Sequence, residues 1–292
     1  MSPTSVQGRL SAALKLAAVI GHPVGHSLSP AMHNAAYEAL GLDWAYLALD
    51  VSPADVPAAL AGMRVFGVLA GLSVTIPHKE AVAAGMDRLS SLAEALGAVN
   101  TVVREPGGTL RGENTDGPGF LRALQGDEGF DPSGRRCLVI GAGGAARAVV
   151  KALADAGAAE IVVANRTRSR AEAVAALAPG CARVGVAAEA GEADLIVNAT
   201  PVGMAGGGAD SELPLDPADL GSGQLVVDLV PNPAITPLID QARARGAVAV
   251  NGLGMLVHQA ALAFRLWTGV DPPVAVMSAA ALRELSHRSS PT

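Results

Sequence analysis

The stretch Cys137–Leu153, CLVIGAGGAARAVVKAL, decides the fold of the second half of this chain. Its first four residues are apolar and typical of a buried strand, and a helical run follows the glycines at once. Gly141, Gly143 and Ala146 fill the pattern G-x-G-x-x-G/A. The first glycine permits a tight turn, the second lets the backbone approach a pyrophosphate, and the small third residue lets the helix lie close to the strand. The stretch therefore predicts a dinucleotide-binding turn; a tight turn without a ligand is the alternative.

The segment Glu160–Arg170, EIVVANRTRSR, indicates which dinucleotide this turn would hold. A site for NAD usually carries an acid near the end of this strand, where it binds the ribose 2′-hydroxyl. Asn165 stands there instead, and a largely basic group follows it: Arg166, Thr167, Arg168 and Arg170. Because guanidinium groups bind phosphate through paired hydrogen bonds, the segment favours NADP(H). Arginines that are only solvated at a helix start are the alternative.

Outward from this motif, short apolar runs alternate with alanine-rich helical runs along both halves of the chain. This alternation predicts an α/β protein of two lobes, an N-terminal domain with a mostly parallel sheet and a Rossmann domain. The loop-like Leu124–Arg135 separates the two series of runs, and the helical tail after residue 253 has no further strand to cover. We expect one domain of residues 1–116 and 253–292 and a dinucleotide-binding domain of residues 117–252.

Composition excludes several classes of protein. The chain has 292 residues, of which 50% are hydrophobic, and a net charge of −6, so it has ample core material and no basic surface for nucleic acid. Its apolar runs fall short of the ~20 residues that cross a bilayer. The two cysteines form neither a disulfide framework nor a metal pattern. We expect a cytoplasmic protein that binds neither membranes nor nucleic acid.

Two polar clusters follow predicted strands in the first half. In GHPVGHSLSPAMHN, residues 21–34, Ser29 as a helix N-cap with Pro30 behind it is an ordinary helix start, which leaves Ser27 and the histidines unexplained. In GLSVTIPHKEAV, residues 71–82, Pro77 opens a helix and places Lys79 in its first turn. A cation is unfavourable there because the helix N-terminus is already positive, so Lys79 indicates chemistry.

Two further candidates are Asn100 in GAVNTV and Asp116 in GENTDGPGF. A turn residue is the alternative for Asn100, and a helix cap is the alternative for Asp116. The four histidines of this half have no spacing that suits a metal ligand set, so no metal is expected. They are His22, His26, His33 and His78.

These stretches together resemble the shikimate dehydrogenase family, in order along nearly the whole chain. The matching motifs are GHPVGHSLSPAMHN, VTIPHK, GAVNT, NTDG, GAGGAARA, NRT, NATPVGM and NGLGMLVHQAALAFRLWTG. The resemblance implies reversible NADPH-dependent reduction of 3-dehydroshikimate to shikimate, a step toward chorismate and the aromatic amino acids. It implies a small-molecule substrate and a monomer or homodimer.

The resemblance also implies roles for individual residues. Lys79 and Asp116 would form the catalytic acid/base pair. Substrate would be bound by Ser27, Ser29, Ser73, Thr75, Asn100 and Gln259. The pyrophosphate would lie on Gly141, Gly143, Gly144 and Ala145. The 2′-phosphate would be held by Asn165, Arg166, Thr167 and Arg170. Thr200, Gly254 and Met255 would lie near the nicotinamide.

The chain departs from the family pattern at two positions. Ser73 stands where the family usually has asparagine, and Pro231 stands where it usually has a tyrosine. Both changes concern the substrate and leave Lys79 and Asp116 in place. They leave open the alternative that the chain is a paralogue that acts on quinate or an amino-substituted shikimate. A non-catalytic NADP-sensing protein is a further alternative.

Overall fold

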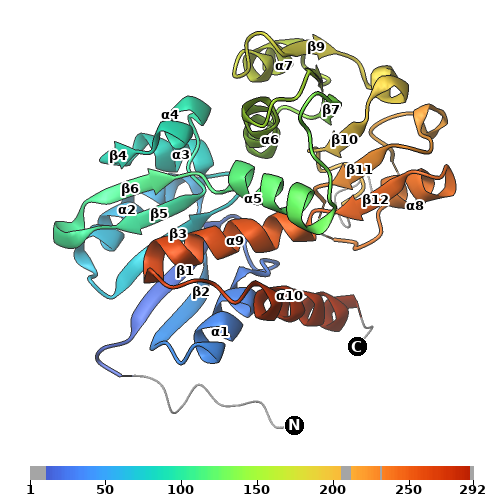
Figure 1. Cartoon of the computed structure of the whole chain (residues 1–292). Helices are drawn as coiled ribbons and strands as arrows, with labels where there is room; N and C mark the ends of the chain where they lie inside the picture. The colour runs from blue at the N-terminus through green and yellow to red at the C-terminus, as the bar shows by residue number, and fades with distance from the viewer. Residues whose placement is uncertain (1–10, 205–211, 231, 290–292) are drawn as a thin grey trace. The chain divides into compact units, whose positions relative to one another are not determined.

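The computed structural model describes residues 11–204, 212–230 and 232–289, and these form two compact units (Figure 1). Unit 1 comprises Met1–Thr115 with Ala260–Thr292, and unit 2 comprises Asp116–Gln259. The chain thus leaves unit 1, completes unit 2 and returns. The expected limit at 116/117 lies one residue from the first division, and the expected limit at 252/253 lies seven residues before the second. That these limits bound independently folding domains stays a prediction.

Unit 1 is built on a mixed six-stranded sheet. Its strands are β1 Lys15–Gly21, β2 Trp44–Asp50, β3 Leu69–Val74, β4 Arg88–Leu89, β5 Thr101–Arg104 and β6 Leu110–Glu113, in the order β2-β1-β3-β5-β6-β4. Only β5 runs antiparallel to its two neighbours. The other three described pairings are parallel, as expected for a mostly parallel sheet.

The helices of unit 1 connect and cover these strands. They are α1 Ser29–Ala39, α2 Val56–Val65, α3 Lys79–Ala84, α4 Ser91–Leu96 and α10 Val274–Ser289, with the later part of α9 Leu253–Thr268. Short 3-10 turns lie at Pro53–Asp55 and Pro106–Gly108. Figure 1 shows α10 beside α1, so the helical tail packs on the first unit.

The two faces of this sheet have different cores. On one face Ile20 and Leu72 pack against Leu60 and Met63 of α2. On the other face Gly71 lies beneath Trp267 of α9, and a Cβ atom added to Gly71 would lie 2.2 Å from the indole nitrogen. That close approach lets the indole donate to the Val102 carbonyl at 3.0 Å. Unit 1 therefore has an aliphatic side and an aromatic side.

Unit 2 is a doubly wound sheet in which every described pairing is parallel. Its strands are β7 Arg136–Ile140, β8 Glu160–Ala164, β9 Ala182–Gly185, β10 Leu195–Asn198, β11 Leu225–Asp228 and β12 Val248–Asn251. The order β12-β11-β10-β7-β8-β9 reverses direction between β7 and β10. This is the Rossmann order, in which nucleotides bind beyond the carboxyl ends of the strands at the reversal. The predicted fold class is confirmed.

Helices cover both faces of this sheet, and α8 lies beside β12 (Figure 1). The helices of unit 2 are α5 Asp116–Arg122, α6 Gly144–Asp155, α7 Arg168–Ala175 and α8 Pro237–Ala244, with the start of α9. A π-helical segment occupies Ala123–Asp127, and 3-10 turns occupy Ala187–Glu192 and Pro217–Asp219. The expected loop at Leu124–Arg135 therefore begins as a continuation of α5. Within the described ranges, no helix has both the length and the apolar character needed to cross a bilayer.

Candidate functional site

The serine loop joins β1 to α1 and differs from the expected helix start. Leu28 occupies the N-cap position, and Ser29 is the first helical residue, so the expectation that Ser29 caps the helix is wrong. Instead the Ser27 hydroxyl accepts a hydrogen bond from the Ser29 backbone nitrogen at 3.2 Å. From the end of α10, Arg288 donates to the carbonyls of His26 and Ser27 and fixes the loop from outside.

Beneath this loop lies an aromatic cluster that sequence reasoning missed. The ring of His33 stacks on that of Tyr46 at 4.3 Å between centroids, and Trp267 lies 5.3 Å from His33. Neither ring nitrogen of His33 has a hydrogen-bond partner among the described residues, and burial lowers its pKa to about 3. The cluster therefore holds a neutral imidazole.

The hydroxyls of Ser29 and Ser73 lie near the hydroxyl of Tyr46 in this cluster. Burial raises the pKa of Tyr46, and the two serines oppose that rise. Neither serine makes a hydrogen bond of acceptable geometry to the tyrosine. Ser29 and Ser73 are both buried, at 6% and 8% exposure. Polar groups this deep are stable only when they find partners, so the three hydroxyls together could bind a ligand oxygen.

Lys79 is the first residue of α3, so it lies in the first helical turn as expected. Pro77 does not open the helix, because it lies before the N-cap residue. His78 stands at the N-cap position, and its Nε2 donates to the Val51 carbonyl at 2.7 Å, because a carbonyl can only accept. The Lys79 carbonyl accepts from the Val99 nitrogen at 3.0 Å, which joins α3 to the segment that carries Asn100. Thr75 leaves β3 with its backbone nitrogen bonded to the Ile20 carbonyl at 2.9 Å.

Asn100 is buried at the start of β5 and organises the chain that leads to Asp116. Its Nδ2 donates to the Thr115 hydroxyl at 2.9 Å, and its Oδ1 accepts from the Thr115 nitrogen at 2.8 Å and the Thr101 hydroxyl at 3.0 Å. Because Asp116 follows Thr115 directly, this network fixes the residue before it. Thr101 and Thr115 are buried members of this network that the sequence analysis did not single out, and the buried Asn114 beside them donates to the Ala98 carbonyl at 3.0 Å.

Asp116 is buried at 5% exposure and begins α5 in unit 2. A carboxylate in the first turn of a helix is favoured by the helix dipole. The glycines that follow let α5 pack closely. A Cβ atom on Gly117 would lie 2.9 Å from the Ala148 carbonyl of α6, and one on Gly119 would lie 2.6 Å from the Gln259 nitrogen of α9. Within unit 2, the helix that Asp116 begins therefore lies against Gln259.

The glycine-rich turn has the geometry that its motif predicts. Gly141 has a φ of +117°, and a Cβ atom there would lie 2.8 Å from the Ala199 carbonyl. Gly143 is the N-cap of α6, and a Cβ atom there would meet nothing within 4 Å. Gly144 and Ala145 supply the first backbone N–H groups of α6, a helix of twelve residues. The open space at Gly143 and the helix N-terminus together suit a pyrophosphate.

The basic segment after β8 lies at the same edge of the sheet. Asn165 donates from Nδ2 to the Thr167 carbonyl at 2.9 Å, and Thr167 is the N-cap of α7. Arg166 and Arg170 are exposed, whereas Arg168 pairs with Glu172 one helical turn later. Because Asn165 stands where an NAD site carries an acid, a 2′-phosphate would meet amide and guanidinium groups rather than a carboxylate.

The remaining predicted residues lie after β10 and at the start of α9. The Thr200 hydroxyl donates to Oδ1 of Asn198 at 2.7 Å. Gly254 and Met255 lie in the first turn of α9, and Gln259 in the next turn donates to the Leu256 carbonyl at 2.8 Å. Pro231, the second departure from the family pattern, lies outside the described residues.

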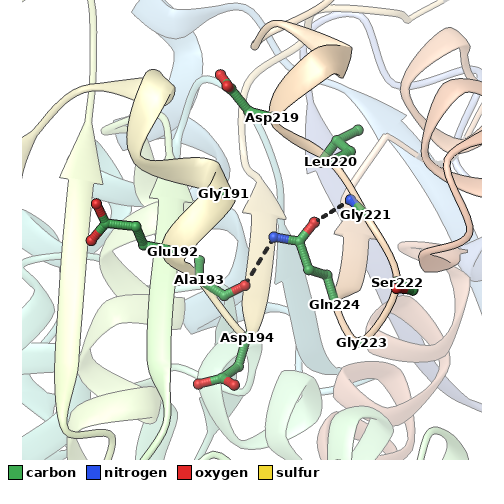
Figure 2. Close-up of a pocket in the computed structure, with 10 residues that line it drawn as sticks. All are labelled: Gly191, Glu192, Ala193, Asp194, Asp219, Leu220, Gly221, Ser222, Gly223 and Gln224. Carbon is green, nitrogen blue, oxygen red and sulfur yellow. Dashed lines mark hydrogen bonds between the residues drawn. The ribbon is translucent and has the colours of Figure 1, made fainter.

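A groove of about 440 Å³ lies elsewhere on unit 2 (Figure 2). It is lined by residues 191–194 and 219–224, which precede β10 and β11, so it is at the amino ends of these strands. Gln224 crosses it, and its side-chain amide nitrogen donates to the Ala190 and Ala193 carbonyls. The acids Glu192 and Asp194 pair with arginines at the start of β7. The groove is therefore a structural feature at the opposite end of the strands from the glycine-rich turn. Within the described residues, no group of three His, Cys, Asp or Glu side chains could hold a metal ion.

Known proteins match both units of the chain. Family models match residues 19–102 as a shikimate dehydrogenase substrate binding domain, residues 126–202 as shikimate/quinate 5-dehydrogenase and residues 252–282 as a shikimate 5′-dehydrogenase C-terminal domain. A shikimate dehydrogenase (NADP(+)) from Methanopyrus kandleri is 50% identical, over 96% of this chain and 99% of the relative. The chain belongs to the shikimate dehydrogenase family.

Solved structures of this family have the same fold. Shikimate 5-dehydrogenase from Thermus thermophilus, in complex with NADP(H) and shikimate, is 45% identical with a TM-score of 0.86, over 93% of this chain and 100% of that one. Quinate dehydrogenase from Corynebacterium glutamicum, in complex with NAD, is 35% identical with a TM-score of 0.84, over 92% and 99%. The family therefore includes enzymes named for two related ring acids.

Proposed function

We propose that this protein catalyses the reversible NADPH-dependent reduction of 3-dehydroshikimate to shikimate, with residues 1–116 and 253–292 as the substrate-binding domain and 117–252 as the NADP-binding domain. One observation carries the proposal. Buried hydroxyl and amide groups in unit 1 and a glycine-rich turn on a doubly wound sheet in unit 2 occur in a chain 45% identical to an enzyme that holds shikimate and NADP(H). Each half supplies what one of the two reactants needs.

The nucleotide half fits NADP(H) by its own geometry. Gly141, Gly143, Gly144 and Ala145 would hold the pyrophosphate on the N–H groups of α6. The 2′-phosphate would be held by the group after β8: Asn165, Arg166, Thr167 and Arg170. Thr200, Gly254 and Met255 would lie beside the nicotinamide. When bound, NADPH supplies the hydride that reduces the substrate carbonyl.

The substrate half would bind a small polyhydroxylated ring acid. Ser27 and Ser29 would bind the carboxylate, and the remaining polar groups would hydrogen-bond the ring: Ser73, Thr75, Asn100 and Gln259. Asn100 already uses its amide within the described network, so it would present a fixed rather than a mobile group. A ligand that lacks one hydroxyl would leave its partner unsatisfied, which costs about 1–3 kcal/mol.

Lys79 and Asp116 would provide the proton transfer. During reduction, negative charge grows on the carbonyl oxygen; the Lys79 ammonium would stabilise that charge and deliver a proton to the oxygen. The Asp116 carboxylate would orient the ammonium, and after the transfer it would take up a proton from water and pass it to the neutral Lys79 amine. Acid/base help of this kind is typically worth ~10² to 10⁴ in rate. Support comes from two hydrogen bonds in unit 1: the Val99 nitrogen donates to the Lys79 carbonyl, and the nitrogen of Thr115, the residue before Asp116, donates to Oδ1 of Asn100.

A second candidate, oxidation of quinate, is favoured by one observation. Ser73, which replaces the usual asparagine, is shorter and leaves more room beside the ring. A panel of shikimate, quinate and aminoshikimate, each assayed with NADP⁺ and NAD⁺, separates the candidates. We expect the highest kcat/KM for shikimate with NADP⁺. A preference for quinate or aminoshikimate would reassign the substrate, and nucleotide binding without turnover of any of them would indicate a sensor.

A further inference from the structure

Asp228 is a fully buried carboxylate at the carboxyl end of β11, and the proposed chemistry does not use it. Three neutral groups donate to it. Asn198 Nδ2 at 2.9 Å and the Val230 nitrogen at 3.1 Å reach Oδ1, and the Thr236 hydroxyl at 2.6 Å reaches Oδ2. Burial raises the pKa of Asp228, and these hydrogen bonds oppose the rise. A buried carboxylate is costly, so its contacts call for an explanation.

The first consequence of Asp228 is the orientation of Asn198, its register partner on β10. A carboxylate accepts hydrogen bonds and donates none, so the amide nitrogen of Asn198 must face Asp228 and the amide oxygen must face away. That oxygen accepts from the Thr200 nitrogen at 3.1 Å and the Thr200 hydroxyl at 2.7 Å. The Thr200 hydroxyl accepts in turn from the Val202 nitrogen at 3.2 Å. The hydrogen bonds of the segment 199–202 therefore depend on this one orientation of the Asn198 side-chain amide.

This segment, which we call the Thr200 loop, lies against the glycine-rich turn. The Ala199 nitrogen donates to the Ile140 carbonyl at 2.8 Å. A Cβ atom on Gly141 would lie 2.8 Å from the Ala199 carbonyl and 3.2 Å from Cγ2 of Thr200. The loop and the turn are thus in contact.

The strand order shows which half of the nucleotide the Thr200 loop faces. The basic segment for the 2′-phosphate follows β8, on one side of β7, and the Thr200 loop follows β10, on the other side. A dinucleotide whose pyrophosphate lies at the end of β7 and whose adenosine lies over β8 must place its second nucleoside over β10. The loop therefore faces the nicotinamide half.

We propose that Asp228 is a positioning residue for the nicotinamide half of the bound dinucleotide, and that it acts through Asn198 on the Thr200 loop. This inference rests on the proposed function, because it takes the dinucleotide to be NADP(H). Asp228 itself would touch neither nicotinamide nor substrate.

The test compares two probes by titration calorimetry on the full chain, NADP⁺ and 2′,5′-ADP. The second probe carries the adenosine and the 2′-phosphate but no nicotinamide. In Asp228→Ala and in Asn198→Ala we expect NADP⁺ binding to weaken about ten-fold more than 2′,5′-ADP binding, which equals about 1.4 kcal/mol. The double variant should lose no more than either single variant, because the two residues act as one unit.

Two further variants control for a loss of stability alone. Asp228→Asn keeps an oxygen that can face Asn198, so its ratio of the two dissociation constants should stay near that of the wild type. Thr236→Val breaks the hydrogen bond on the other side of Asp228 and the N-cap bond to Ile239. It should lower the melting temperature and leave the ratio unchanged.

Equal weakening of the two probes, or no weakening of either, would overturn the inference. Should Asp228→Ala fail to fold, Asn198→Ala removes the other half of the pair and decides the question. Turnover of the substrate panel by the wild type is measured independently of these binding ratios. A wild type that turns over no panel substrate but shows the shifted ratio in its variants refutes the proposed function alone. An active wild type whose variants weaken both probes equally refutes this inference alone.

Discussion

Replacement of His33 by phenylalanine should change how the stability of unit 1 depends on pH. His33 is fully buried, and burial lowers its pKa to about 3 from the ordinary 6.5. Between these two values the unfolded chain binds a proton that the folded chain does not, so stability falls as pH falls below about 6.5 and is fully present above it. Phenylalanine keeps the stack on Tyr46 and binds no proton.

The size of the effect follows from these two pKa values. From pH 7.5 to pH 5.0, His33 alone should remove about 2 kcal/mol from the free energy of unfolding, at about 1.36 kcal/mol per pH unit below 6.5. The figure hardly depends on whether the folded pKa is 3 or 4. Overpacking by the larger ring would shift stability equally at both pH values, so it leaves the difference intact.

Urea unfolding followed by tryptophan fluorescence measures this effect where it occurs. Both tryptophans, Trp44 and Trp267, lie in unit 1. His33→Phe should gain about 2 kcal/mol over the wild type on going from pH 7.5 to 5.0, or about 1 M in urea midpoint at an m value of about 2 kcal/mol/M. His287→Gln, at an exposed position on α10, should follow the wild type. Parallel curves for His33→Phe and the wild type would refute the reasoning.

Three further predictions concern the nucleotide half. Gly141→Ala should lower the free energy of unfolding by about 1–3 kcal/mol, because φ at this position is +117° and the added Cβ atom would meet the Ala199 carbonyl. A melting temperature like that of the wild type would contradict this. Gly143→Ala should keep the wild-type melting temperature, since its Cβ atom meets open space, but should bind NADP⁺ more weakly in calorimetry. Unchanged affinity for NADP⁺ would show that the pyrophosphate does not lie beside Gly143. Arg166→Ala should raise the KM for NADPH about ten-fold or more and that for NADH little, as charged hydrogen bonds contribute about 1.5–3 kcal/mol; equal effects would show that Arg166 does not bind the 2′-phosphate.

Local sequence predicted the strand–turn–helix around Gly141 well, because every requirement of that turn lies within ten residues. The small residues that the turn and the close helix need stand next to one another in the chain. The sequence also placed Lys79 correctly in the first turn of α3, but Pro77, expected to open this helix, lies before its N-cap residue His78. For such motifs the residues that interact are also neighbours in sequence.

Contacts set by strand register could not be predicted in this way. Asn198 and Asp228 are thirty residues apart and meet because β10 and β11 pair in one particular register. The stack of His33 on Tyr46 likewise depends on how α1 packs on β2. The expected N-cap at Ser29 was wrong for a local reason: the Ser27 hydroxyl already binds the Ser29 nitrogen, and the helix begins one residue earlier than a serine cap would allow.

The most direct test of the central claim is the turnover of Lys79→Ala with shikimate and NADP⁺, measured as the appearance of NADPH. We predict a loss of about 10² to 10⁴ in kcat, with wild-type folding and wild-type affinity for NADP⁺, because Lys79 would hold the proton and not the nucleotide. A correctly folded Lys79→Ala protein that turns over shikimate at close to the wild-type rate would contradict the account.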